Sequence, residues 1–139
     1  MRILGLDVGE RRIGVALSDP LGLTAQRLTT VERHGPRQDA LAIARLAQEH
    51  EAQGLVVGLP LTMRGELGEQ AKKVTEFVES LKPRLTCPIH LMDERLTTAQ
   101  SQRALLETDT NRRRRKALID QLSAQLILQA YLDAKTATR

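Results

Sequence analysis

The chain has 139 residues, the size of one compact domain, so we predict a single domain over residues 1–139. Hydrophobic residues make up 41% and charged residues 27% of the chain, which excludes an intrinsically disordered protein. Lysine and arginine outnumber aspartate and glutamate by 21 to 17, and this balance favours a polyanionic partner. One phenylalanine, one tyrosine and no tryptophan argue against binding of bases by aromatic stacking.

The N-terminal sequence and the cysteine content indicate where the protein is located and which cysteine-based sites it lacks. The opening MRILGLDVG lacks the apolar segment and cleavage site of a signal peptide, and no apolar run has the length of a membrane span. We therefore expect a cytoplasmic protein with no membrane partner. Cys87 is the only cysteine, which excludes an internal disulfide and any multi-cysteine metal site.

The first third of the chain predicts three antiparallel strands. An apolar run over 2–7 ends in Asp7 and is followed by a turn and a second run over 12–18, which is typical of a β-hairpin. A turn at 19–22 then leads into the threonine-rich and aliphatic segment 23–31, which we interpret as a third strand. These segments predict an antiparallel meander.

The rest of the chain predicts helices alternating with two buried strands. The elements in chain order are a helix beginning near Pro36, a strand over 55–60, a helix over 69–81, a strand over 88–94, a helix over 97–107 and a final helix over about 116–134. The order βββαβαβαα requires crossover connections, which place the fourth and fifth strands parallel to the first. We therefore expect an α/β fold of ribonuclease-H-like topology, with a five-stranded mixed sheet flanked by helices.

Acidic residues end two of the predicted strands. Asp7 closes the first strand, and Asp93 and Glu94 close the fifth. Parallel strands bring their carboxyl ends to one edge of a sheet, and open α/β sheets bind ligands at that edge. An acid at a strand end is also common where the chain simply meets solvent, so one such residue alone does not indicate a site.

A third acid, Asp120, lies among apolar residues near the start of the final helix. A buried carboxylate needs a cation or strong hydrogen bonds, although an acid in a first helical turn can also be stabilised by the helix dipole. Carboxylates gathered at one edge would repel one another without a divalent cation, and oxygen ligands favour Mg²⁺ or Mn²⁺ over zinc. A pair of such ions is suited to hydrolysis of phosphodiester bonds.

Four ordered blocks of sequence carry a family resemblance: GLDVGERRIGVALSD, VVGLPLTMRGELG, DERLTT and KALIDQLSAQLILQAYLD. They closely resemble the YqgF (RuvX) family over nearly the whole chain. Members are described as Holliday-junction resolvases and as nucleases that process the 5′ end of pre-16S ribosomal RNA, and their fold is ribonuclease-H-like. The resemblance implies that Asp7, Glu94 and Asp120 are the catalytic and metal-binding residues, which selects Glu94 over Asp93.

Turn residues and basic residues surround the expected site. Gly9 follows Asp7 in a tight turn, and we expect Gly58 and Pro60 to shape a substrate-positioning loop, although ordinary turn chemistry also explains them. The basic residues expected to bind nucleic acid are Arg11, Arg12, Arg64, Arg95, Arg112, Arg113, Arg114, Arg115 and Lys116. Arginine binds phosphate in a bidentate manner, but each of these residues is also explained as a solvated surface charge.

The sequence thus predicts a metal-dependent endonuclease acting on structured nucleic acid. We favour processing of the 5′ end of pre-16S rRNA in ribosome biogenesis, with resolution of branched DNA in recombination and repair as the alternative. Junction resolution usually needs a symmetric dimer, and the sequence leaves the oligomeric state open. An actin-like ATPase is disfavoured because such proteins close two domains around a nucleotide, and a non-catalytic nucleic-acid-binding module is disfavoured by the acids.

Overall fold

The structure, a computed structural model, describes residues 1–96 and 112–137. Its elements are β1 (Ile3–Val8), β2 (Arg12–Ser18), β3 (Ala25–Glu32), α1 (Pro36–Glu49), β4 (Gly54–Leu59), α2 (Glu69–Leu81), η1 (Lys82–Arg84), β5 (Ile89–Asp93), η2 (Glu94–Leu96) and α4 (Arg112–Ala137). The helix expected over 97–107 lies outside the described residues. No helix within the described ranges is both long and apolar enough to cross a membrane.

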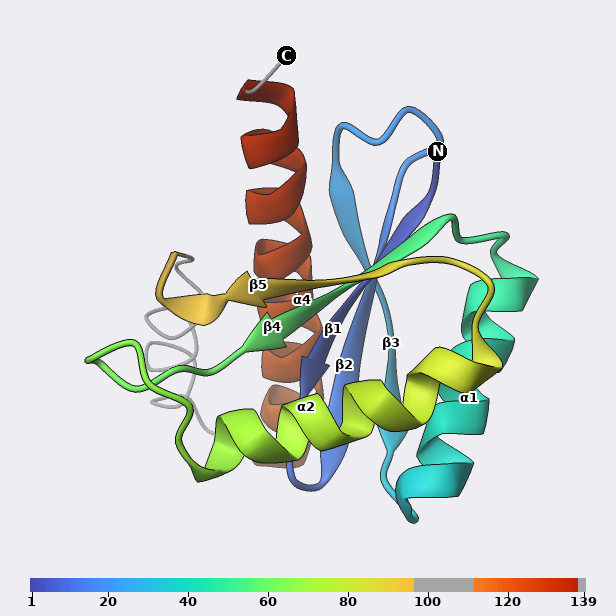
Figure 1. Cartoon of the computed structure of the whole chain (residues 1–139). Helices are drawn as coiled ribbons and strands as arrows, with labels where there is room; N and C mark the ends of the chain where they lie inside the picture. Colours follow the sequence, from blue (N-terminus) through green and yellow to red (C-terminus); the bar gives the residue numbers. More distant parts are fainter. Residues whose placement is uncertain (97–111, 138–139) are drawn as a thin grey trace.

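The five strands form one mixed sheet in the order β3-β2-β1-β4-β5, with β1 at its centre (Figure 1). β1 pairs antiparallel with β2, and β2 pairs antiparallel with β3. β4 runs parallel to β1, and β5 runs parallel to β4. The structure therefore confirms the predicted meander, the parallel pairing of the later strands and the ribonuclease-H-like order.

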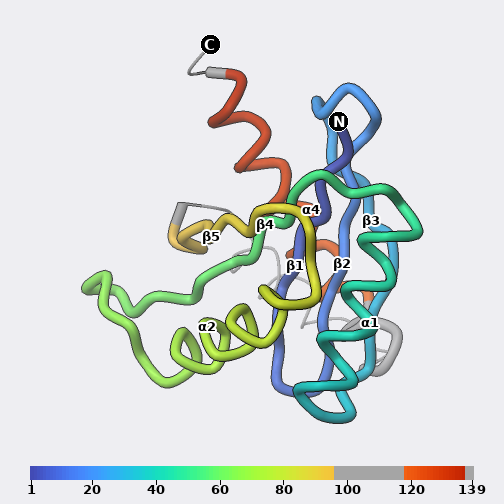
Figure 2. The backbone as a smooth tube through the Cα atoms, turned by 45° about the vertical axis from the view of Figure 1, so that its right-hand side comes forward, coloured from blue at the N-terminus to red at the C-terminus, as the bar shows by residue number. Residues whose placement is uncertain are grey.

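Helices α1 and α2 cover one face of the sheet, and α4 lies against the other (Figures 1 and 2). Pro36 begins α1 in the first helical turn, where its missing N–H is not needed. Buried aliphatic and aromatic side chains fill the space under α1 and α2; from the sheet and the helices these include Leu4, Leu6, Ile13, Val15, Ile43, Phe77 and Leu81. This is the larger of the two cores.

The opposite face combines glycine and alanine in the strands with aliphatic side chains, several of them from α4. Alternation along β1 turns Leu4 and Leu6 toward α1 and α2, so Ile3 and Gly5 face α4. The buried residues of this second core include Ala16, Ala25, Ala124, Ile127 and Leu128. Helix α4 therefore packs close to the strands.

Several boundaries near the acidic residues differ from the sequence predictions. The basic cluster 112–116 lies inside α4 instead of preceding it, because arginine and lysine favour helix and no breaker separates them from the apolar segment. The fifth strand ends at Asp93, whose carboxylate accepts a hydrogen bond from the backbone N–H of Arg95 at 2.9 Å and turns the chain. Glu94 consequently opens η2. Gly58 lies within β4, as the predicted strand over 55–60 requires, so it precedes the loop that it was expected to shape.

Candidate active site

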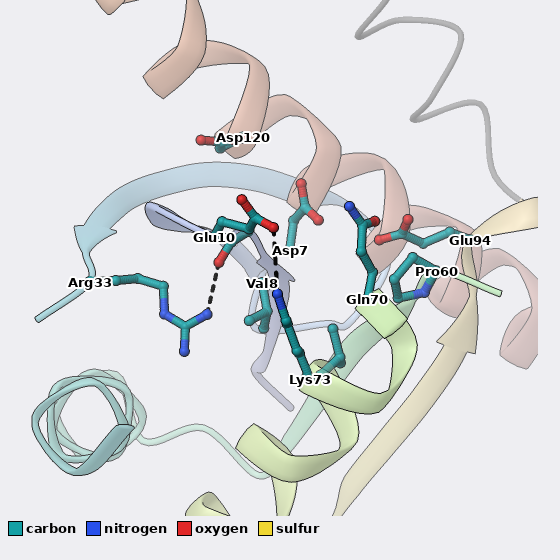
Figure 3. Close-up of a pocket in the computed structure, with 11 residues that line it drawn as sticks. Asp7, Val8, Glu10, Arg33, Pro60, Gln70, Lys73, Glu94 and Asp120 are labelled. Atoms are coloured by element: carbon teal, nitrogen blue, oxygen red, sulfur yellow. Dashed lines mark hydrogen bonds and ion pairs between the residues drawn. The ribbon is translucent and has the colours of Figure 1, made fainter. Parts of the chain in front are cut away.

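A cavity of about 270 Å³ lies at the end of β1, and all three acids singled out in the sequence line it: Asp7, Glu94 and Asp120 (Figure 3). They come from β1, from η2 and from α4, which are far apart in the chain. Gly9 and Glu10 from the β1–β2 turn complete one side. Arg33, Gln70 and Lys73 line the cavity from the segment after β3 and from α2.

Asp7 reaches the cavity because strand alternation puts it on the face that α4 covers. It is 6% exposed, and its antiparallel partner in β2 is Gly14. A Cβ atom on Gly14 would lie 1.9 Å from the backbone oxygen of Asp120. The absence of that side chain is therefore what allows the part of α4 around Asp120 to lie beside Asp7.

The position of the Glu94 side chain depends on a second glycine, Gly58. Glu94 is 5% exposed, and a Cβ atom on Gly58 would lie 2.6 Å from its Oε1 and 2.5 Å from Cδ1 of Ile127 in α4. Gly58 thus leaves the space between β4 and α4 that the glutamate side chain occupies. In Figure 3 the Glu94 carboxylate points toward Asp7.

The three carboxylates share a cavity without forming a closed ligand cluster. Within residues 1–96 and 112–137, no group of three or more acidic, histidine or cysteine side chains is arranged to hold a metal ion. Figure 3 shows the reason, since the Asp120 carboxylate is turned away from Asp7 and Glu94. The chemistry of the donors, three carboxylates of which two are almost fully buried, still fits a hard divalent cation.

The turn between β1 and β2 is fixed by contacts on several sides. The backbone N–H of Gly9 donates to the carbonyl of Arg12 at 2.8 Å, which is the tight turn expected from the sequence. Arg33 Nη1 donates to the Gly9 carbonyl at 2.8 Å, and Lys73 Nζ lies 3.6 Å from Glu10 Oε1. Because this turn directly follows Asp7, these contacts hold the wall of the cavity next to that carboxylate.

Four of the basic residues singled out in the sequence do not line this cavity: Arg11, Arg12, Arg64 and Arg95. Arg11 and Arg64 are exposed, and Arg12 Nε pairs with Glu32 at 3.2 Å. The backbone of Arg112, Arg113, Arg114, Arg115 and Lys116 forms the first turns of α4, but their side chains lie outside the described part of the structure. Their expected role in binding nucleic acid stays a prediction.

Arg95 contacts the loop after β4. Its Nη2 lies 2.7 Å from Asp93 Oδ2, and its Nη1 donates to the Met63 carbonyl at 3.4 Å. The hydrogen bonds from Arg95 lower the pKa of the Asp93 carboxyl, and the same carboxylate raises the pKa of the guanidinium. A Cβ atom on Gly65 would lie 3.2 Å from this guanidinium, so the loop closes tightly over it.

Sequence reasoning missed the cationic wall of the cavity, which consists of Arg33 and Lys73. One signal was available, because Asp39 stands beside Ala40 near the start of an amphipathic helix, where a carboxylate on the apolar face needs a cation. The structure supplies Arg33 as that cation, at 3.1 Å. No pattern in the sequence distinguishes Lys73 from its neighbour Lys72.

Comparison with known proteins gives the family. A family model described as "RuvX: Holliday junction resolvase" matches residues 1–134. A protein of Moorella thermoacetica named "Putative pre-16S rRNA nuclease" is 53% identical over 133 residues, covering 96% of this chain and 95% of the relative. A protein of Clostridium novyi with the same name is 49% identical over 134 residues, covering 96% of this chain and 99% of the relative.

Solved structures give the same fold at low sequence identity. Thermus thermophilus RuvC in complex with a Holliday junction substrate superposes with a TM-score of 0.65 at 14% identity, covering 99% of this chain and 97% of that chain. A fowlpox virus resolvase in complex with Holliday junction DNA gives 0.57 at 11% identity, covering 97% and 99%. The chain therefore has a ribonuclease-H-like fold and belongs to the RuvX Holliday junction resolvase family.

Proposed function

We propose that this protein is a metal-dependent endonuclease that hydrolyses phosphodiester bonds in structured nucleic acid. The observation that carries the proposal is the convergence of Asp7, Glu94 and Asp120, from three distant elements, on one cavity. These are the catalytic residues of the proposal. The nuclease names of relatives about half identical to this chain, over nearly its full length, support the same reaction class.

The same three carboxylates are the proposed ligands of Mg²⁺ or Mn²⁺, with two ions expected. Burying Asp7 and Glu94 as neighbouring anions is costly, and a divalent cation offsets that cost. Such ions activate the attacking water and stabilise the charge that develops on the leaving oxygen. The Asp120 side chain must turn toward the cavity, which a half-buried residue near the start of a helix can do by a change of rotamer.

For the substrate we propose precursor 16S rRNA, cut at its 5′ end. Two relatives that each cover 96% of this chain are named as pre-16S rRNA nucleases. A four-way DNA junction is the second candidate, because the matching family model is described as a Holliday junction resolvase. The same acids would hydrolyse either backbone, so only the geometry of the bound nucleic acid distinguishes the two substrates.

The test is cleavage of a labelled 5′-extended 16S rRNA precursor and a labelled four-way junction, in Mg²⁺ or Mn²⁺ and in EDTA. We expect Asp7→Asn, Glu94→Gln and Asp120→Asn each to lower cleavage by about two to four orders of magnitude, the usual contribution of groups that activate an attacking water. Asp133→Asn is the matched control, since Asp133 lies on the same helix but is exposed and far from the cavity.

Metal binding is measured separately, as the rise in melting temperature on addition of Mn²⁺. The wild type and Asp133→Asn should be stabilised, and Asp7→Asn should not. Cleavage that persists in EDTA, or in all three site variants, would contradict the proposed function. Stabilisation by ATP without any effect of Mn²⁺ would favour a nucleotide-binding protein instead.

A further inference from the structure

Arg33 is held rigidly at the wall of the cavity. Its Nε donates to Asp39 Oδ2 at 3.1 Å, and its Nη1 donates to the Gly9 carbonyl at 2.8 Å. The guanidinium carbon lies 5.2 Å from the centre of the Phe77 ring, so one face of the group rests on an aromatic ring. Two hydrogen bonds and a ring contact therefore fix the orientation of this guanidinium.

Asp39, the carboxylate that pairs with Arg33, is buried. Its side chain is 2% exposed, and its other oxygen accepts the backbone N–H of His34 at 2.9 Å. A buried ion pair contributes little net stability compared with apolar residues of the same volume, because both charges lose their hydration. The pair is therefore better explained as a device that orients Arg33 than as a source of stability.

The guanidinium keeps hydrogen-bonding capacity for a ligand. It carries five N–H donors, and two of them make the bonds to Asp39 and Gly9. For the other three, no acceptor is found among residues 1–96 and 112–137. The side chain is 22% exposed and lines the cavity, so these donors are available where a substrate would enter.

Lys73 adds a second cation to the same wall. It lies on α2 together with Gln70, one turn earlier, and both residues line the cavity (Figure 3). Its side chain is 64% exposed, and its Nζ is 3.6 Å from Glu10, a loose surface pair that contributes little and that an incoming anion can replace. The cavity thus has the three candidate catalytic acids on one side and the two cations on the other, with Glu10 beside Lys73.

We propose that Arg33 and Lys73 form a phosphate-binding subsite, which holds a backbone phosphate of the cut strand beside the phosphate that the acids hydrolyse. The proposal rests on the proposed nuclease function. A planar, pre-oriented guanidinium binds two phosphate oxygens at once, and the ammonium supplies a second charge. The subsite places the strand by its backbone, so it does not select base sequence.

The test is binding of nucleic acid by the full chain in EDTA, which prevents cleavage. Fluorescence anisotropy of the labelled rRNA precursor and of the labelled junction gives the affinity from about 50 to about 200 mM salt. We expect Arg33→Gln and Lys73→Gln each to weaken binding about tenfold, and to reduce the slope of log affinity against log salt by about 0.7 to 0.9, the value of one lost phosphate contact. Arg33→Lys should bind with intermediate affinity.

Lys72→Gln and Arg37→Gln are the matched controls, because both residues are exposed and neither lines the cavity. They should leave the affinity and the salt slope unchanged. Arg33→Gln leaves Asp39 buried without its cation, so the double variant Arg33→Gln, Asp39→Asn removes both charges and should show the same loss of slope. Lys73→Gln changes an exposed side chain and does not endanger folding.

A purely structural role for Arg33 gives a different result. In that case the Arg33 variants would melt at lower temperature while the salt slope stayed at the wild-type value, and the subsite would be overturned. An unchanged slope in Lys73→Gln would overturn it as well. If the wild type cuts nucleic acid but the Arg33 and Lys73 variants keep the wild-type salt slope, only the subsite is contradicted. If the wild type binds neither the rRNA precursor nor the junction, the proposed function is contradicted as well.

Discussion

The two faces of the sheet are covered in opposite ways. Under α1 and α2 the space is filled by large side chains such as Leu6, Phe77 and Leu81. Against α4 the strands present glycines, and a Cβ atom on Gly5 would lie 2.7 Å from Cβ of Leu128. One face is therefore held apart by large side chains, while on the other the helix comes close to the strands at their glycines.

The two faces therefore have different roles: one mainly stabilises the fold, and the other positions the acids of the candidate site. Each large side chain buried under α1 and α2 contributes about 1.5 to 3 kcal/mol of hydrophobic free energy, so that face contributes strongly to stability. The α4 face holds all three acids of the candidate site, and their meeting depends on how closely the helix approaches. Adding atoms to the α4 face and removing atoms from the other face should therefore have different effects on activity.

The largest effect is expected from Gly14→Ala. The new Cβ would lie 1.9 Å from the backbone oxygen of Asp120 and 2.3 Å from its carbonyl carbon, so α4 must move as a whole. We expect a loss of more than about 3 kcal/mol in the free energy of unfolding, above the usual cost of overpacking, because backbone cannot relax like a side chain. Cleavage by the remaining folded protein should be abolished, because Asp120 is displaced.

Gly54→Ala is the matched control. Gly54 also lies in the sheet, at the start of β4, but a Cβ atom there would find its nearest neighbours at 3.9 Å, which is ordinary contact. Chemical denaturation and the cleavage assay should give values close to the wild type for this variant. If Gly14→Ala and Gly54→Ala lost the same stability, the loss would be a general effect of replacing a strand glycine. The close approach of α4 to Gly14 would then not be its cause.

Leu81→Ala should have the next largest effect on stability and a different effect on activity. Leu81 is fully buried at the end of α2, on the face away from the acids. Truncation leaves a cavity and should cost about 3 kcal/mol in denaturant unfolding. Cleavage per folded molecule should stay at the wild-type level below the melting temperature. A fall in that specific activity would mean that packing under α1 and α2 also affects the position of the acids. Leu41→Ala, at an exposed position of α1, is the control for the substitution itself.

Much of the fold follows from local patterns in the sequence. The alternation of apolar residues in β1 and the helical spacing in α1 are strong, short-range signals, and the crossover rule then fixes the parallel pairing. Asp7 was also predictable, because an acid at a strand end needs only the strand to be located. The boundaries of β2 match the predicted run over 12–18.

The contacts of α4 with the glycines were not predictable from such patterns. Gly14 cannot be told from any other strand glycine in the sequence, because the helix that covers it begins about a hundred residues later. The ion pair of Arg95 with Asp93, two residues earlier, was likewise not indicated by the sequence, and the expected role of Arg95 in binding nucleic acid stays a prediction. Arg33 was missed because its role depends on Asp39 and on the Gly9 carbonyl together, which only the folded chain brings into reach.

Of the substitutions at sites of close packing, Gly58→Ala is expected to have the smallest effect on stability. It tests most directly whether the α4 face positions the acids. Here the added Cβ would meet the tip of Ile127 at 2.5 Å and Glu94 Oε1 at 2.6 Å, both ends of flexible side chains that can move. The free energy of unfolding should fall by only about 1 to 2 kcal/mol. Glu94, however, gives up its place beside Asp7, so cleavage should fall by at least about tenfold, as when the surroundings of a metal ligand are altered. The stabilisation by Mn²⁺ should shrink in parallel. Gly54→Ala in the same strand again serves as the control, and full activity of Gly58→Ala would mean that the space left by this glycine is not what places Glu94.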